Sequence, residues 1–512
     1  MSLGEAVIMK LERSSGILLH PTSLPGKFGI GSLGKEAFEF IDILVTTRQK
    51  LWQILPLGPT GYGDSPYQSF STFAGNPLVI DLEKLVEDGL LSTNELDTQE
   101  HFGDKKVDFG KVISFKYPLY RKAFKNFKAS CCEAEKLAFD VFCKEQNDLW
   151  LDDYSLYASL KDHFKGKQWN EWDEDIKLRE AHALNKYREQ LTEEREFYKF
   201  LQYEFFKQWG AVKKYANSHK IKIVGDIPIF VSIDSSDAWA NADLFFFDEK
   251  KNPTKVAGVP PDYFSKTGQL WGNPLYDWAK MKKTGYAWWI NRIRSVMSTC
   301  DVVRIDHFRG FSAYWAVPAS NKDAIIGEWE KGPGADFFHA LKKALGDIQV
   351  IAEDLGVITP DVEKLRDEFG FPGMKILQFA FDPNEESSYI PHRHICNCVI
   401  YTGTHDNDTT SGWYQKLTEK EKKYIQEYLD VREEDVTWGL IRAAFASTAK
   451  MAIIPMQDVL SLGSNARMNT PGAPSGNWQW RFSKEQLSDT IKDRLKKLTT
   501  IYRRNQLTQQ DD

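Results

Sequence analysis

The chain has 512 residues, with 66 Lys and Arg, 72 Asp and Glu, and a formal net charge of -6. The mixed charge and the lack of a long basic run argue against nucleic acid or an anionic membrane as a partner. No segment approaches the roughly 18 uninterrupted apolar residues of a membrane span. The N-terminal "MSLGEAVIMKLERSSG" has neither a long apolar core nor a small-residue cleavage site. We therefore expect a cytoplasmic protein with no membrane or nucleic-acid partner.

The cysteine and aromatic residues say little about the function. The six cysteines are sparse for this length, and "HRHICNC" (392–398) lacks the second ligand cluster of a zinc site. We expect ordinary reduced thiols and no bound metal. The 16 Trp, 20 Tyr and 32 Phe fit either a large core or a surface that stacks on pyranose rings. This count alone does not decide between them.

Eight short apolar segments recur along the chain, and each ends in a polar or Gly/Pro-rich loop. Amphipathic helical patterns separate most of them, for example "WWINRIRSVMST" (288–299), and Thr359-Pro360 is typical of a helix start. This alternation predicts a (β/α)8 TIM barrel, with the active site at the carboxyl ends of the strands. An open doubly wound sheet is the alternative, since periodicity does not show closure. The predicted strand segments are 15–26, 51–61, 221–231, 301–311, 348–360, 374–382, 399–409 and 452–460.

Two segments interrupt the alternation. Residues 81–192 are charged and helical, which predicts an inserted helical subdomain between a first part of the barrel (1–80) and its remainder (193–512). Whether this insertion binds starch or supports the barrel stays open. Residues 232–276 form a long Gly/Pro/aromatic loop, and a loop of this length is usually functional or disordered. Only about 50 residues follow the eighth strand, too few for a C-terminal β-sandwich.

Acidic residues follow four of the predicted strands. Because the carboxyl ends of barrel strands meet at one rim, we expect these side chains to lie close together. Acid clusters can bind metals, but the cation of Arg304 beside Asp306 lessens that need. The residues at these strand ends are Asp226, Asp306, Glu353, Asp354, His405, Asp406 and Asp408.

Arg304 and Asp306 are two apart at the end of a strand, so they share one face. The guanidinium can hold that carboxylate ionised, although a purely structural ion pair is the alternative. One ionised and one protonated carboxyl group are what glycosidic bond cleavage requires, and they lie about 5–5.5 Å apart in retaining enzymes.

Several motifs resemble those of one family. "VVRIDHFRGF", "IAEDLGVITP" and "YTGTHDNDT" resemble the strand ends of the α-amylase clan, and more narrowly the amylomaltase or disproportionating-enzyme family of 4-α-glucanotransferases. "LPLGPTGYGDSPYQSFSTFAGNP" and "GVPPDYFSKTGQLWGNPLY" are similar to this family's signatures, and the resemblance runs over 14–481. It implies that Asp306 is the nucleophile, Glu353 the general acid/base and Asp406 a third carboxylate. The residues alone do not choose Glu353 over Asp354, or Asp406 over Asp408.

The same resemblance implies a set of glucan-binding residues and no cofactor. Arg304, His307, His405 and Asp226 would surround the sugar whose bond is cleaved. Ser65 and Tyr67 would contact bound glucan, and Tyr62 would belong to a secondary glucan site. The long loop after the third strand offers a means to exclude water, with Asp262, Tyr263, Phe264 and Trp271 as a roof and Gly258 and Gly268 as flexible joints; a packed structural loop is the alternative.

The resemblance implies transfer of an α-1,4-glucan segment to the 4-hydroxyl of another glucan or of glucose. The substrates would be maltooligosaccharides and fragments of starch or glycogen. An α-amylase-like hydrolase is the nearest alternative, but it predicts a calcium site and a C-terminal β-sandwich. A catalytically silent glucan-binding protein would be expected to lack Asp306, Glu353 or Asp406, and a barrel enzyme for phosphorylated sugars would need a basic phosphate pocket.

Overall fold

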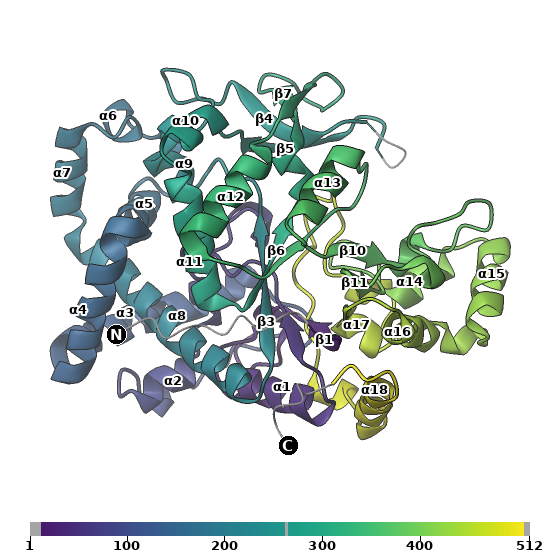
Figure 1. Ribbon diagram of the computed structural model, residues 1–512. Coiled ribbons are helices and arrows are strands. Elements are labelled where there is room, and N and C mark those ends of the chain that lie inside the picture. Colours follow the sequence, from purple (N-terminus) through teal and green to yellow (C-terminus); the bar gives the residue numbers. More distant parts are fainter. Residues whose placement is uncertain (1–11, 262–264, 506–512) are drawn as a thin grey trace.

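The centre of the computed structural model, which describes residues 12–261 and 265–505, is an eight-stranded parallel sheet (Figure 1). Its strand order is β10-β11-β12-β1-β2-β3-β6-β9. The amide of Ala352 in β9 donates to the carbonyl of Pro372, just before β10, at 2.9 Å. The two end strands therefore meet, and the predicted (β/α)8 barrel is confirmed against the open sheet. The strands are β1 (Ser14–Leu18), β2 (Leu51–Gln53), β3 (Lys222–Pro228), β6 (Val302–Asp306), β9 (Val350–Ala352), β10 (Gly373–Ile376), β11 (Cys398–Tyr401) and β12 (Met451–Pro455).

The barrel strands are buried on both faces, as expected for parallel strands covered by helices. Every residue of β1, β2, β11 and β12 is buried. Gly16 allows β1 and β2 to approach closely, because a Cβ at this position would lie 2.3 Å from the carbonyl oxygen of Leu51. Each of the eight predicted strand segments overlaps one of these strands, and four of the strands begin one residue earlier than predicted.

Helices surround the barrel where the 3.6-residue periodicity predicts them. In α1 (Lys35–Thr46), the buried residues Ala37, Phe40, Ile41 and Leu44 lie three or four positions apart on one face, which packs against the core. Pro360 opens α13 as expected, but the Thr359 side chain makes no capping hydrogen bond. The helices expected from the sequence are α1 (Lys35–Thr46), α8 (Thr192–Ser218), α11 (Ala287–Thr299), α12 (Gly334–Leu345), α13 (Pro360–Glu368), α16 (Val436–Ala446) and α18 (Asp489–Ile501).

Residues 81–192 are helical and lie beside the barrel, against α8 (Figure 1). Trp169, Trp172 and Trp239 are buried together in a separate apolar cluster that joins this segment to the chain after β3. The helices are α2 (Leu82–Glu87), α3 (Phe109–Ser130), α4 (Glu133–Gln146), a π-helix over Asn147–Leu151, α5 (Asp152–His163), α6 (Glu174–Lys177) and α7 (Ala181–Gln190).

Residues 232–276, expected as a loop, contain regular structure. They form α9 (Ser236–Ala240), β4 (Lys255–Val259) and β5 (Gln269–Pro274). With β7 (Ala313–Pro318) and β8 (Glu328–Lys331) these strands make a four-stranded antiparallel sheet at the top of Figure 1. Gly258 is therefore not a flexible joint. It is paired inside β4, and a Cβ there would lie 2.7 Å from the carbonyl oxygen of Gln269.

After β12, residues 456–505 contain α17 (Met456–Val459) and α18 and no strand, so they contain no β-sandwich. Five α-helices of residues 12–261 and 265–505 fell outside the sequence prediction, namely α9, α10 (Trp278–Lys283), α14 (Thr410–Gln415), α15 (Glu419–Leu429) and α17. Among residues 12–261 and 265–505, no helix combines the length and the apolar character needed to cross a membrane.

Candidate active site

Four barrel strands deliver the predicted acids to one end of the barrel. Asp226 lies in β3 and Asp306 ends β6, while Glu353 directly follows β9 and Asp406 lies in the loop after β11. Their charges act on one another, since Glu353, Asp226 and Asp406 each raise the pKa of Asp306. The carboxylates that the sequence placed at one rim therefore form one cluster.

Arg304 lies at the centre of this cluster. Its Nη1 donates to both carboxylate oxygens of Asp226, at 2.8 and 2.6 Å, and its Nη2 lies 3.0 Å from Oδ1 of Asp306. The Asp226 side chain is 0% exposed, whereas that of Asp306 is 28% exposed. Strand alternation correctly placed Arg304 beside Asp306, but it did not show that Arg304 divides its charge between two carboxylates. Asp226 is the buried partner, and Asp306 keeps access to the cleft.

The carboxylate of Glu353 is anchored by two backbone amides. Oε2 accepts from the amide of His307 at 2.7 Å, and Oε1 accepts from the amide of Leu355 at 3.0 Å. His307 adopts a left-handed conformation with φ 54°, which costs a non-glycine residue about 1–3 kcal/mol. The strained turn brings the residue after Asp306 against Glu353.

Burial controls the protonation of both carboxyl groups. It raises the pKa of Glu353 to about 6, against the opposing effects of Arg304 and the two amides. Burial also raises the pKa of Asp306 well above its ordinary value, Arg304 opposes this, and the Glu353 carboxylate adds to it. Arg304 alone thus does not set the charge of Asp306. Burial therefore favours the protonated form of both carboxyl groups, Arg304 favours the ionised form of both, and the charge of Glu353 affects the titration of Asp306.

Asp406 is held by the chain after β12. Asn469 Nδ2 donates to Oδ1 of Asp406 at 2.6 Å, and Arg467 Nη2 donates to the Asp406 carbonyl at 2.6 Å. The amide of Asn469 also donates to the carbonyl of His405 at 3.1 Å. Sequence reasoning did not identify Arg467 and Asn469, which lie in the long loop after β12 and α17. Their place in a rim loop after a barrel strand was the available signal.

Three packed rings, those of Tyr67, His405 and Trp478, lie beside the carboxylate cluster. Tyr67 donates its hydroxyl to Oδ2 of Asp226 at 2.9 Å, and its ring stacks on His405 with centroids 5.1 Å apart. Trp478, which sequence reasoning missed, packs against both rings at 5.7 and 5.9 Å. Burial lowers the pKa of His405, so its imidazole is neutral near pH 7. Tyr67 and Asp226, far apart in the chain, are thereby joined, and the expected contact of Tyr67 with bound glucan stays a prediction.

Trp271 of β5 meets His307 edge-on, with ring centroids 4.8 Å apart. Burial lowers the pKa of His307 to about 3, so this imidazole is also neutral. The small sheet therefore reaches the cluster through Trp271. The other three residues of the expected roof, Asp262, Tyr263 and Phe264, lie outside the described residues.

The remaining two predicted glucan contacts lie in the loop after β2. Ser65 Oγ accepts from the amide of Tyr67 at 3.3 Å, so it orients the turn that presents Tyr67. Tyr62 begins a 3₁₀-helix (Tyr62–Asp64), and its side chain lies outside the described part of the structure.

Two acids that the residues alone left as alternatives are engaged elsewhere. Asp354 is buried, pairs with Arg366 and accepts from the amide of Met374 at 2.7 Å. Asp408 pairs with Lys416 and accepts from Ser464 Oγ at 2.8 Å. Glu353 and Asp406 are thus the members of each pair that belong to the cluster.

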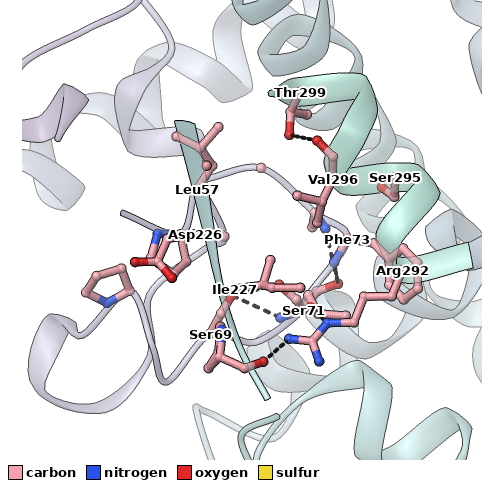
Figure 2. A pocket seen from close by; sticks show the side chains of 18 of the residues that line it. Leu57, Ser69, Ser71, Phe73, Asp226, Ile227, Arg292, Ser295, Val296 and Thr299 are labelled. Carbon is pink, nitrogen blue, oxygen red and sulfur yellow. Dashed lines mark hydrogen bonds between the residues drawn. The ribbon is translucent and has the colours of Figure 1, made fainter. Parts of the chain in front are cut away.

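A pocket on the outer side of β3 shows how the strand end is supported (Figure 2). Arg292 reaches from α11, is fully buried, and donates from Nε to Thr72 Oγ1 at 2.6 Å. Its Nη2 donates to the carbonyl of Pro228 at 2.6 Å. Arg292 therefore ties the end of β3, which carries Asp226, to the loop that carries Tyr67.

The family model described as 4-alpha-glucanotransferase matches residues 19–487. The chain belongs to the 4-alpha-glucanotransferase family. It is 50% identical to the 4-alpha-glucanotransferase of Synechocystis sp. over 497 residues, which cover 96% of this chain and 98% of the relative. It is 49% identical to the 4-alpha-glucanotransferase of Thermus thermophilus over 496 residues, which cover 95% and 98% of the two chains. The chain is an enzyme of this class, and the hydrolase alternative is not favoured.

Solved structures agree with the family assignment. The amylomaltase of Streptococcus agalactiae in complex with acarbose superposes with a TM-score of 0.94 at 42% identity. The match covers 97% of this chain and 100% of that one. The amylomaltase of Corynebacterium glutamicum, at 18% identity and a TM-score of 0.74, shares the fold; the match covers 95% of this chain and 75% of that one.

Proposed function

We propose that the enzyme moves a segment of an α-1,4-glucan to the 4-hydroxyl of another glucan, or of glucose, by retaining double displacement. Asp306 is the nucleophile, Glu353 the general acid/base and Asp406 the carboxylate that binds sugar hydroxyls. The observation that carries this proposal is the hydrogen bond from the His307 amide to Glu353, which fixes the acid/base beside the nucleophile.

In the first half-reaction an oxygen of Asp306 attacks the anomeric carbon, and the glycosidic bond to the leaving glucan breaks. The proton on Glu353 passes to the leaving oxygen, which leaves a glucosyl ester on Asp306. In the second half-reaction the 4-hydroxyl of the acceptor gives its proton to Glu353 and attacks the same carbon. Asp306 is released, Glu353 is protonated again, and no cofactor is consumed.

The remaining residues bind and orient the glucan. Arg304 favours the ionised form of Asp306 from 3.0 Å away, and Asn469 fixes Oδ1 of Asp406 while Oδ2 lies 3.4 Å from His405 Nε2. We assign substrate contacts around the cleaved bond to Arg304, His307, His405, Ser65 and Tyr67, and roofing to Trp271. The Asp226 side chain is fully buried against Arg304 and Tyr67, so it supports these residues and does not contact the sugar. The roofing role of Asp262, Tyr263 and Phe264 and the secondary glucan site at Tyr62 stay predictions.

A transferase must favour a sugar hydroxyl over water at the glucosyl ester. Trp271 and Tyr67 are partly exposed beside the carboxylate cluster, where their rings would displace water and stack on sugar rings. The acarbose complex of the similar amylomaltase supports a cleft that binds maltooligosaccharide-like molecules. Maltooligosaccharides and fragments of starch or glycogen are the proposed donors.

The insertion is proposed to support the barrel rather than to bind starch. Asp234, in the chain after β3, accepts from Tyr157 at 2.7 Å and from Lys161 at 2.8 Å. Trp169 donates its indole to the carbonyl of Ile233 at 2.5 Å. These contacts make residues 81–192 a subdomain that anchors the start of the 232–276 segment.

We also propose a cytoplasmic location, where the enzyme would act in glucan metabolism. All six cysteines are free, which suits a reducing compartment.

Trapping the covalent intermediate tests the mechanism. The Glu353→Gln variant, incubated with α-maltosyl fluoride, should gain the mass of one maltosyl unit on the peptide that carries Asp306. Fluoride leaves without a proton, so the first step proceeds, whereas the second step lacks its base. Asp306→Asn in the same background is the control. A maltosyl adduct on another residue, or product of inverted configuration, would contradict the proposal.

A further inference from the structure

Asp458 is a buried carboxylate beneath the loop that carries His405 and Asp406. It lies in α17, directly after β12, and is 1% exposed. Its Oδ2 accepts from Thr402 Oγ1 at 2.5 Å and from Thr410 Oγ1 at 2.7 Å. Its Oδ1 accepts from the amide of Thr410 at 2.7 Å. One side chain therefore receives three hydrogen bonds from two residues of a neighbouring segment.

Those two residues are the two ends of a single loop. Thr402 directly follows β11, and Thr410 is the first residue of α14. The residues between them include His405 and Asp406, which belong to the carboxylate cluster. Asp458 thus joins the base of the loop at both sides, from outside the loop.

The charge of Asp458 calls for an explanation beyond space filling. Burial raises the pKa of Asp458, the hydrogen bonds from Thr402 and Thr410 oppose this, and the charge of Asp408 adds to it. Among the described residues, no Lys, Arg or His forms an ion pair with Asp458. Burying a carboxylate without a cation is costly, and a neutral side chain would fill the same space at lower cost. Charge-assisted hydrogen bonds are shorter and stronger than neutral ones, and they fix geometry more tightly.

The rest of the loop is fixed from other sides. Gln378 donates its Nε2 to the carbonyl of Asp408 at 2.9 Å, and Asn469 holds the Asp406 carboxylate at the tip. Asp406 keeps its position only if the base of the loop stays in place relative to these two supports. Asp458 sets that base, because both ends converge on its two oxygens.

We propose that Asp458 is a positioning residue for glucan transfer, which fixes both ends of the 402–410 loop and thereby places Asp406 against the reacting sugar. This inference rests on the proposed role of Asp406. Asp458 acts through its carboxylate on Thr402 and Thr410 and touches no substrate.

Thr402→Val tests the inference with a nearly isosteric change that removes one donor. We expect kcat for maltotriose disproportionation to fall about tenfold with little change in KM. Thr402→Ser keeps the hydroxyl and should restore most of the activity. Thr410→Val, which keeps the amide hydrogen bond, should show the same pattern more weakly and serves if Thr402→Val does not fold.

The matched control is Thr499→Val. Thr499 is also fully buried and accepts from Gln49 Nε2 at 2.8 Å, but it lies in α18, away from the cluster. It should lose thermal stability comparably and keep its kcat. If Thr402→Val also keeps its kcat, Asp458 only stabilises the fold and the inference is overturned.

A double-mutant cycle then asks whether the effect passes through Asp406. Acarbose is the probe, and its Kd is measured by calorimetry in variants too slow for kinetics. We expect Thr402→Val to weaken acarbose binding about tenfold beside Asp406, and less than about twofold beside Asp406→Asn. Equal weakening in both backgrounds would overturn the inference. Full activity of Asp406→Asn alone would refute the proposed role of Asp406, and this inference with it.

Discussion

Oε2 of Glu353 lies 2.7 Å from the backbone nitrogen of His307, the residue that follows Asp306. The two carboxyl groups proposed for catalysis are thus linked through the backbone of β6 and do not depend on a flexible side chain for their spacing. The left-handed conformation of His307 points that amide at Glu353, so the spacing of the two carboxyl groups depends on this turn.

The first prediction concerns the leaving group. Glu353→Gln should lower kcat/KM for maltotriose by roughly 10²–10⁴-fold, the usual contribution of a general acid. With α-maltosyl fluoride as donor the loss should be far smaller, because fluoride needs no protonation. Steady-state kinetics with both donors check this. An equal loss with both would mean that Glu353 does not protonate the leaving group.

The second prediction concerns pH. Because the pKa of Glu353 is raised to about 6, the free enzyme keeps a usable proton up to about that pH. Above it, kcat/KM for maltotriose should fall as Glu353 loses the proton that the leaving oxygen needs. The profile with α-maltosyl fluoride should lack this descending limb. If activity fell at the same pH with both donors, the loss would come from a group other than the one that protonates the leaving oxygen.

The third prediction concerns Asp226→Asn. Removing this negative charge frees Arg304 for Asp306 and takes away a like charge, so the pKa of Asp306 should fall. The ascending limb of the kcat/KM profile should therefore move to lower pH. Breaking the buried pair should also cost roughly 3–5 kcal/mol of stability, measured by urea unfolding. A limb that moves to higher pH would contradict this electrostatic account.

The fourth prediction concerns Tyr67→Phe. The change keeps the ring stacked on His405 but removes the hydroxyl that donates to Asp226 at 2.9 Å. The lost hydrogen bond to a buried carboxylate should cost about 1–3 kcal/mol, so kcat/KM should fall several-fold to about a hundredfold. Far-UV circular dichroism should be unchanged. Unaltered kinetics would show that the Tyr67 hydroxyl does not hold Asp226 in place.

The fifth prediction separates support from substrate binding in the insertion. Asp234→Asn weakens the bonds from Tyr157 and Lys161 and should lower the free energy of unfolding by about 1–3 kcal/mol. Starch and maltotriose activities of the folded enzyme should change in the same proportion. A selective loss on starch would instead indicate that this segment binds the polymer.

The barrel was predictable because its signals are local. Eight apolar segments alternate with helical patterns, and each overlaps one observed strand. The small sheet was not predictable in the same way. Its strand β5 begins Gln269-Leu270, both exposed, and is stabilised by pairing with β4 rather than by a buried face of its own. The many Gly, Pro and Trp residues in this segment are typical of a loop, so the sequence did not predict its pair of strands.

In the site too, contacts within one strand were predictable and contacts between distant segments were not. Alternation placed Arg304 beside Asp306, since both belong to one strand. Contacts between distant segments were invisible, as with Asn469 on Asp406 and Trp478 on His405. The bond between Arg304 and Asp226 joins two neighbouring strands, and it appears only when β3 and β6 are paired in register.

The most direct test of the central claim is incubation of the purified enzyme with maltotriose and no added cofactor, following glucose, the oligosaccharide ladder and total reducing ends. Glucanotransfer predicts glucose and maltodextrins longer than maltotriose at constant reducing ends, with the activity abolished in Asp306→Asn. Rising reducing ends without longer products would mean hydrolysis and would contradict the account.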